Sequence, residues 1–265
     1  MRIARVFPTK TRMCPDDPDA YFGFPPENVP EYDEIHISVT FTWDIPKIER
    51  LQKAWSKYGF VKVGGPALGD PGSFFVPGLY LKHGATITSR GCPNKCSFCF
   101  VHRREGALRE LPIVPGHIIQ DNNLLACSER HVSKVFEMLQ GQKKIDFVGG
   151  FEASRITPDL VSKLKQIKLY QLWLAYDTPQ AKGAVENAIA LLRPHFNQNK
   201  IRCYVLVGYG NDTVLEAQKR LEWVYNLGAL PFAMLYHTHI EWKKLHRLWT
   251  RPAAMRSVMK LNEYN

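Results

Sequence analysis

In the second part of the chain, short apolar runs of strand type alternate with segments in which apolar residues recur at helical spacing. Short apolar runs of strand type occur at 85–89, 117–120, 145–148, 169–176, 201–208 and 231–236. Between most of these runs, apolar residues recur every three or four positions, as they do on the buried face of a helix. Strands that alternate with helices predict an α/β fold with a parallel sheet of six strands.

Several boundaries of these expected helices carry their own signals. Ser128 precedes the first helix as an N-cap residue, and Gly141 ends it. Thr157 and Pro158 start the next helix, and Pro194 stops the one after that. The connection between the first two strands shows no clear helical pattern, so we expect an irregular first crossover there.

Residues 1–80 repeat this pattern on a smaller scale. Strand-like runs lie at 3–7, 34–41 and 60–66, and Asp44 and Pro46 open a helix that Gly59 closes. We therefore expect a small α/β unit at residues 1–80 and a second domain at residues 81–265. Residues 66–84 hold four glycines and three prolines, a composition typical of a linker.

Three of the six cysteines share one short segment, with the spacing C-x3-C-x2-C at Cys92, Cys96 and Cys99. A tight loop of this kind can place three thiolates on one face of an iron–sulfur cube. Three ligands leave one iron open to a small molecule. Structural zinc is an alternative, but it prefers four ligands in two spaced pairs, and the sequence offers no second pair nearby. Plain core cysteines are the remaining interpretation.

The other cysteines, Cys14, Cys127 and Cys203, are scattered singly, as in proteins that keep thiols reduced. No run approaches the roughly 18 uncharged apolar residues of a membrane span. The first residues form too short an apolar segment for a signal peptide. We therefore expect a cytoplasmic protein with no membrane partner.

The formal net charge is +10, with an isoelectric point near 9.3. A strongly basic chain favours an anionic partner, of which nucleic acid is the commonest, although basic charge also serves solubility. The run Lys243–Arg251 interleaves aromatic and basic residues, as strand-binding surfaces do. The same run also fits an amphipathic helix with a solvated basic face.

The cysteine segment, with the aromatic residue Phe100 after its last cysteine, resembles the cluster loop of radical S-adenosylmethionine (radical SAM) enzymes. Arg104-Glu105-Gly106 is similar to a segment that follows the cluster in the cobalamin-type and methylthiotransferase-like branch. The resemblance implies a partial (β/α)6 radical SAM barrel at 81–265, preceded by the small α/β unit. It implies a 4Fe-4S cluster on the three cysteines, with S-adenosylmethionine on the open iron.

The same resemblance implies the chemistry. Reductive cleavage of S-adenosylmethionine yields a 5′-deoxyadenosyl radical, which abstracts hydrogen from the substrate. An external one-electron donor, flavodoxin or ferredoxin, is implied. No side chain is singled out as catalytic.

In parallel α/β folds, ligand-binding groups gather at the C-terminal ends of strands. The resemblance implies a contact to the methionine amino group at the end of the second strand, in a G-G-E-type segment, and two stretches compete for that role. Gly149-Gly150-Phe151-Glu152 is similar to this segment in composition, and Asp121-Asn122-Asn123 occupies the position by strand count, which we favour. The other residues implied for S-adenosylmethionine lie at later strand ends: Glu152 and Arg155, Asp177 for the ribose hydroxyls or the sulfonium side, Gly208 and Tyr209 for the adenosyl group, and Met234 to Tyr236 for the adenine edge.

Val63-Gly64-Gly65-Pro66 is similar to the last part of the cobalamin-binding domain that precedes some radical SAM domains. The D-x-H-x-x-G signature is missing, and His36 lies within an expected strand. We therefore expect no cobalamin.

The leading function is a radical SAM enzyme acting on nucleic acid or a nucleotide-like anionic substrate. The rivals are a radical SAM enzyme for a peptide or small metabolite, and a non-enzymatic zinc-bearing nucleic-acid-binding protein. Whether the substrate is methylated, sulfurated or rearranged is left open.

Overall fold

The computed structural model describes residues 1–70 and 74–262 of the 265-residue chain. The chain divides into two compact units. The first comprises residues 1–95 and 99–116, and the second comprises residues 96–98 and 117–265. The part of the expected linker at 71–73 lies outside the described residues.

The first unit contains a four-stranded parallel sheet of order β2-β1-β3-β4. Its strands are β1 (Ile3–Phe7), β2 (Ala20–Phe22), β3 (Glu34–Ser38) and β4 (Phe60–Gly64). The strands expected around 3–7, 34–41 and 60–66 are confirmed, although β3 ends earlier, at Ser38. The edge strand β2 was not expected, because three residues between proline-containing loops are too few for an alternating pattern to stand out.

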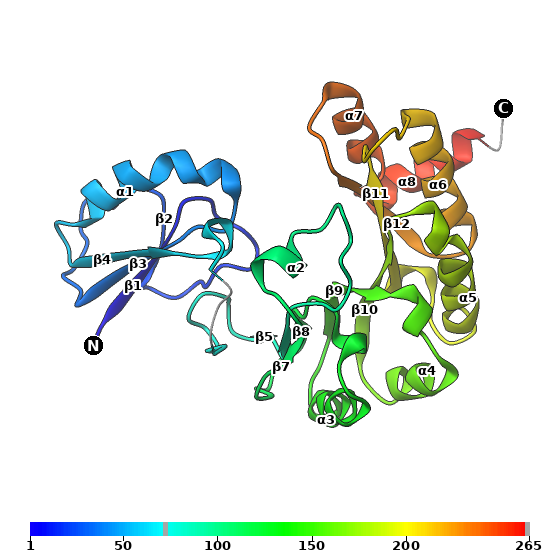
Figure 1. Cartoon of the computed structure of the whole chain (residues 1–265), viewed down its shortest axis with the longest axis horizontal. Coiled ribbons are helices and arrows are strands. Elements are labelled where there is room, and N and C mark those ends of the chain that lie inside the picture. Colours follow the sequence, from blue (N-terminus) through cyan, green and yellow to red (C-terminus); the bar gives the residue numbers. More distant parts are fainter. Residues whose placement is uncertain (71–73, 263–265) are drawn as a thin grey trace. The chain divides into compact units, whose positions relative to one another are not determined.

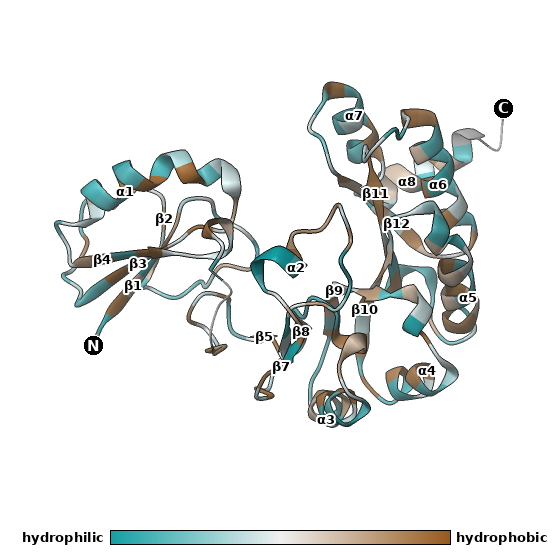
Figure 2. Ribbon diagram, viewed as in Figure 1, coloured by the Kyte–Doolittle hydropathy of each residue, from teal (hydrophilic) through white to brown (hydrophobic). Residues whose placement is uncertain are grey.

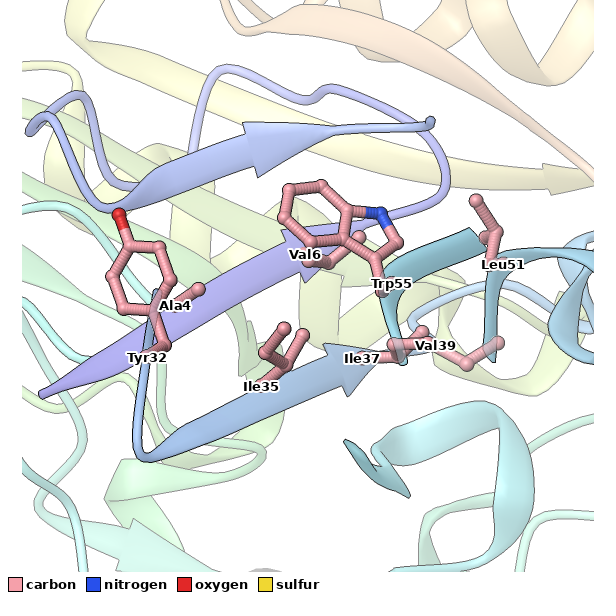
Figure 3. Packing of buried hydrophobic residues seen from close by; sticks show 8 residues of the cluster. All are labelled: Ala4, Val6, Tyr32, Ile35, Ile37, Val39, Leu51 and Trp55. Atoms are coloured by element: carbon pink, nitrogen blue, oxygen red, sulfur yellow. The ribbon is translucent and has the colours of Figure 1, made fainter. Parts of the chain in front are cut away.

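One face of this sheet is covered by the helix α1 (Ile48–Trp55), which follows a 3₁₀ turn at Thr42–Lys47. The buried cluster between them is shown in Figure 3 and consists of Ala4, Val6, Tyr32, Ile35, Ile37, Val39, Leu51 and Trp55. The Trp55 indole is fully buried, and its Nε1 donates a hydrogen bond of 2.9 Å to the carbonyl of Gly23. The unit therefore has its own apolar core, in which the buried indole N–H of Trp55 has a hydrogen-bond acceptor.

The rest of the first unit is built from short elements. A 3₁₀ turn at Pro66–Leu68 is followed by β5 (Ala85–Thr86), β6 (Ser89–Arg90), the four-residue helix α2 (Val101–Arg104) and β7 (Arg109–Glu110). Strands β6 and β7 form an antiparallel pair. The strand expected at 85–89 is thus split into β5 and β6. The irregular first crossover contains the strand β7 and the short helix α2, which is hydrophilic in Figure 2.

The larger sheet has six strands in the order β12-β11-β10-β9-β8-β5. Five of them belong to the second unit: β8 (Ile118–Ile119), β9 (Ile145–Glu152), β10 (Leu169–Tyr176), β11 (Ile201–Val207) and β12 (Leu230–Leu235). The pairs from β8–β9 to β11–β12 are all parallel. The α/β class and the six-stranded parallel sheet are confirmed.

The described residues of the second unit form six helices: α3 (Glu129–Gln140), α4 (Pro158–Lys165), α5 (Lys182–Leu192), α6 (Val214–Asn226), α7 (Ile240–Leu248) and α8 (Pro252–Asn262). Figure 1 shows α3 to α6 arranged along one side of the sheet. Short 3₁₀ turns lie at Leu124–Ala126, Ala153–Arg155, Pro179–Ala181 and Gln198–Lys200. The expected caps are confirmed, since Ser128 Oγ accepts from the His131 amide and Thr157 Oγ1 from the Leu160 amide, each at 3.2 Å.

Alternate residues of the central strands serve opposite faces of the sheet. Leu172, Leu174 and Tyr176 of β10 are buried on one face. On the other, the ring of Trp173 stacks on Tyr204 at 4.3 Å, and Tyr204 meets Phe232 edge-on at 5.9 Å. Within the described residues, none of the helices is long and apolar enough to cross a membrane.

Candidate active site

The loop that carries the three cysteines is fixed at the residue before Cys92. The carboxylate of Glu105 is buried and accepts hydrogen bonds from Arg104 Nη2 at 2.8 Å and Arg90 Nη1 at 3.4 Å. Its second oxygen accepts from the backbone amide of Gly91 at 3.4 Å. A buried carboxylate needs such partners, so the Arg-Glu-Gly segment holds the start of the loop in place.

Glycine is required at position 91 for two reasons. Its φ angle is +80°, in the left-handed region. A Cβ at this position would lie 2.2 Å from the carbonyl oxygen of Ala107. The Cys92 amide, one residue later, donates to the carbonyl of Gly106 at 3.4 Å. At the start of the loop, the backbone at Gly91 therefore passes so close to the backbone at Ala107 that no side chain fits at position 91.

All six cysteines are thiols in the described structure. Cys92, Cys96 and Cys99 are half-buried, whereas Cys14 and Cys203 are buried. Among residues 1–70 and 74–262, no three Cys, His, Asp or Glu side chains are grouped closely enough to hold a metal ion. The loop fits an iron–sulfur cluster in its donor chemistry, because it carries three partly accessible thiols.

The middle of this loop belongs to the second unit, where it contacts the end of β11. The Tyr209 hydroxyl donates a hydrogen bond of 2.7 Å to Ser97 Oγ. The rings of Phe98 and Tyr209 also meet edge-on at 5.6 Å. Tyr209 was predicted to line the adenosyl group, and the structure places it against the residues that follow Cys96.

The two stretches that compete for the methionine amino group contact each other. Asn123 follows β8, and its Nδ2 donates a hydrogen bond of 3.0 Å to Glu152 Oε2 at the end of β9. Arg155 Nε donates to the same oxygen at 2.9 Å, and Ser154 Oγ donates to the other at 3.1 Å. Asp121 and Asn123 are buried, Asn122 and Glu152 are half-buried, and Arg155 is exposed. The stretch that fits by composition and the stretch that fits by strand count thus lie at one location, where Asn123 contacts Glu152.

A bulge in β9 brings these two strand ends together. Leu172 of β10 pairs with Phe147, but Leu174 pairs with Phe151, so β9 carries two extra residues over this interval. A Cβ on Gly149 would lie 1.9 Å from the carbonyl oxygen of Asp121. The strand expected at 145–148 was too short, because the two glycines interrupt its apolar pattern while the backbone continues as a strand to Glu152.

Asp177 comes directly after β10, and its carboxylate has no hydrogen-bond or ion-pair partner among the described residues. Burial raises the pKa of Asp177 to about 6. A largely desolvated carboxylate without a partner is unfavourable unless a ligand supplies a donor or a positive charge. This position suits a ligand with hydroxyl groups or a cationic centre.

The turn after β11 is held by an ion pair that sequence reasoning missed. Arg220 donates from two nitrogens to Asp212, at 2.7 and 2.9 Å, and Asp212 Oδ2 accepts from the Gly208 amide at 2.9 Å. Gly208 has a φ angle of +81°, and a Cβ there would press on the ring of Trp242 at 3.0 Å. In the sequence, the available signal for Asp212 was an acidic residue four positions after Gly208, the last residue of the strand expected at 201–208.

At the end of β12, Met234 and Tyr236 are partly exposed. The rings of Tyr236 and Tyr209 meet edge-on, with centroids 4.8 Å apart. Two of the residues predicted to surround the adenosyl group therefore touch each other. Ser97 and Phe98, which join them to the cysteine loop, were not predicted as site residues.

A cavity of about 710 Å³ lies elsewhere on the second unit, lined by Ala153, Ser154, Ile156, Ala184, Asn187, Ala190 and Leu191. Most of its lining is apolar, and it includes none of the residues predicted to bind the cofactor. Only Ser154, which donates to Glu152, connects it with the strand ends.

The run Lys243–Arg251 falls largely in α7. Its aromatic residue Trp249, like Trp242 just before the run, is buried, whereas Lys243, Lys244 and Arg247 are exposed. The amphipathic-helix interpretation is confirmed, and neither tryptophan is available to stack on a ligand.

Comparison of the sequence with protein-family models and with curated proteins gave no match. The fold and the site therefore define only a class: an α/β protein whose six-stranded parallel sheet carries charged and aromatic groups at the carboxyl ends of its strands.

Proposed function

We propose that the chain is a radical SAM enzyme that abstracts hydrogen from an anionic substrate, with nucleic acid or a nucleotide as the leading class. The observation that carries the proposal is the three-cysteine loop, whose Ser97 and Phe98 contact Tyr209 at the end of β11. This contact supports a link between the thiol-bearing loop and the strand end where an adenosyl group would bind.

Cys92, Cys96 and Cys99 are the residues that would hold a 4Fe-4S cluster. When bound, the cluster supplies the electron for reductive cleavage of S-adenosylmethionine, and flavodoxin or ferredoxin must deliver that electron. The loop's aromatic neighbours, Phe98 and Tyr209, would keep water from the thiols.

The chain's own groups suit the parts of S-adenosylmethionine. Glu152, held by Asn123 and Arg155, offers a carboxylate for the methionine ammonium group. Asp177, which has no protein donor among the described residues, would accept from the ribose hydroxyls. Tyr209 offers an apolar ring for the adenosyl group, and the backbone from Met234 to Tyr236 offers donors and acceptors for adenine.

A partial (β/α)6 barrel is part of the proposal. From β9 to β12, each strand of the larger sheet lies next to the strand that precedes it in the chain, and β8 lies next to β5, the preceding strand of the same sheet. This order is that of a barrel wall wound in one direction, rather than of a sheet that reverses at a switch point. The scattered single occurrence of Cys14, Cys127 and Cys203 in the sequence supports a cytoplasmic location.

The test is anaerobic reconstitution with iron and sulfide, reduction with dithionite, and analysis of the products from S-adenosylmethionine. We expect iron and sulfide in the stoichiometry of one 4Fe-4S cluster, and 5′-deoxyadenosine even without substrate. The variant Cys92→Ala/Cys96→Ala/Cys99→Ala should lose both, whereas Cys14→Ala, Cys127→Ala and Cys203→Ala should each keep the cluster.

Other outcomes would contradict the proposal in distinct ways. A triple variant that still forms a complete cluster would remove these cysteines as ligands. S-adenosylhomocysteine as the sole product would indicate ordinary methyl transfer. Stoichiometric zinc in place of iron would favour a zinc-bearing binding protein. If a peptide or small metabolite, but no nucleic acid, stimulates cleavage, the substrate class is wrong and the reaction class stands.

A further inference from the structure

The segment between β12 and α7 exposes three rings, those of Tyr236, His237 and His239 (the ring segment). Tyr236 is 38% exposed, and both histidines are exposed. The ring centroids of Tyr236 and His237 are 4.8 Å apart, and those of His237 and His239 are 6.1 Å apart. Neighbouring rings thus form a short row on the surface of the second unit.

The first turns of α7 continue this surface with positive charge. Lys243, Lys244 and Arg247 lie at i, i+1 and i+4 and share one exposed side of the helix (the basic face). None of the three forms an ion pair within the described part of the chain. The opposite side carries Trp242 and Leu245, which are buried. The residues 240–251 contain four Lys or Arg and one Glu.

Packing does not account for the exposed rings. Trp249 is fully buried, and its Nε1 donates to Gln218 Oε1 at 2.8 Å. His246 lies 2.7 Å, through Nδ1, from the carbonyl oxygen of Ala233. These side chains fix the end of α7 to α6 and to β12. The backbone carbonyl of His239 accepts from the Lys243 amide at 3.0 Å, but within the described residues neither imidazole ring of His237 and His239 forms a hydrogen bond, and both rings remain available to a ligand.

We propose that the ring segment and the basic face together bind a single-stranded nucleic acid. Unpaired bases stack on exposed rings whatever their sequence, and a row of unpaired cations follows the phosphates. A duplex keeps its bases stacked on each other and offers none to the rings. The inference names the substrate class of the proposed function and rests on it, although the binding itself requires no cluster.

The experiment measures anisotropy of labelled twelve-residue oligonucleotides, as single-stranded RNA, single-stranded DNA and the corresponding duplex. His237→Ala/His239→Ala should weaken single-strand binding by about tenfold, because stacking on each ring is lost. Lys243→Gln/Lys244→Gln/Arg247→Gln should weaken it further and reduce the slope of log K against log salt by about 2, since three phosphate contacts disappear.

The matched control is Lys163→Gln/Lys165→Gln/Lys168→Gln, which removes the same charge at α4 and just before β10. Figure 1 shows α4 and α7 at opposite ends of the second unit. This control should keep at least half of the affinity of the unchanged protein. Equal losses in both triple variants, or tight duplex binding, would overturn the inference in favour of diffuse attraction by net charge. So would an unchanged affinity in the histidine variant.

A binding assay on Cys92→Ala/Cys96→Ala/Cys99→Ala separates the two proposals. If this variant binds single strands with the same dependence on the ring segment and basic face, the surface is supported even where no S-adenosylmethionine is cleaved. If the unchanged protein cleaves S-adenosylmethionine but binds no single strand, the inference fails and the proposed function remains. The RNA and DNA arms identify which polymer the surface prefers.

Discussion

The side-chain amide of Asn123 donates a hydrogen bond of 3.0 Å to the carboxylate of Glu152. Asn123 follows β8 and Glu152 is the last residue of β9, and the two are 29 positions apart in the chain. The contact joins two stretches that the sequence presents as competitors for the same role. A ligand bound at one of these strand ends would therefore meet groups from both.

Replacing Glu152 with Gln should weaken S-adenosylmethionine binding by about tenfold. The substitution keeps the shape of the side chain but removes the charge that would pair with the methionine ammonium group, and hydrogen bonds to charged groups contribute about 1.5–3 kcal/mol. Isothermal titration calorimetry of the reconstituted protein measures the change. Ser154→Ala, which removes only a neutral donor to the other oxygen, should cost less than about threefold.

Asp177 should make the stability of the protein depend on pH. Burial raises its pKa from 3.8 to about 6, so the folded protein binds more protons than the unfolded chain between these values. The free energy of unfolding from this group therefore falls as the pH rises from about 4 to about 6. Asp177→Asn should flatten that part of the profile and raise stability at pH 7 by up to about 3 kcal/mol.

Urea unfolding at a series of pH values, without S-adenosylmethionine, measures this effect. The same variant should bind S-adenosylmethionine more weakly, because the amide keeps only one uncharged acceptor oxygen for the ribose hydroxyls in place of two carboxylate oxygens. A variant that is no more stable at pH 7 than the unchanged protein would contradict the assigned burial of this carboxylate.

Gly149→Ala should destabilise the protein by about 2 kcal/mol or more, because its Cβ would lie 1.9 Å from the Asp121 carbonyl oxygen and the backbone would have to move. The comparison is Gly183→Ala in α5, where a Cβ would meet no atom within 4 Å. That substitution should be neutral or stabilising by about 0.5–1 kcal/mol, since alanine favours the helix. Urea denaturation of both variants provides the measurement. Equal midpoints would refute the close approach of the Gly149 backbone to the Asp121 carbonyl.

The first unit should not bind cobalamin, as expected from the missing histidine loop. His36 lies in β3, with Nε2 at 2.7 Å from Glu34 and Nδ1 at 2.6 Å from the Tyr80 hydroxyl. Both ring nitrogens are thus engaged, and the imidazole could bind cobalt only if the metal displaced one of these partners. Titration with hydroxocobalamin followed by gel filtration checks this, and stoichiometric binding that survives the column would make radical methylation the leading activity.

The regular strands and helix caps could be predicted because their signals are local. The alternating run at 201–208 and the N-cap at Ser128 each depend on a few neighbouring residues. The edge strand β2 could not be predicted, since Ala20–Phe22 is held by pairing with β1 rather than by its own pattern. The extension of β9 through two glycines likewise depends on its partners in the sheet.

The same distinction applies to the candidate site. Strand order alone placed Asn123, Asp177 and Tyr209 at strand ends, where they are found. The hydrogen bond from Tyr209 to Ser97 spans 112 positions, and no local pattern encodes such a contact. The ion pair of Asp212 with Arg220 escaped notice because charged residues on a helix and its preceding turn are usually solvated.

The strand order of the larger sheet also bears on how the chain is made. From β9 to β12, every strand pairs with the one synthesised just before it. A ribosome adds about 5–20 residues per second, so each further strand and helix emerges within a few seconds of its partner. The sheet can therefore grow during translation, one strand at a time, before the C-terminus is synthesised. At each stage the most recently paired strand is the edge of the sheet, until β12 completes it.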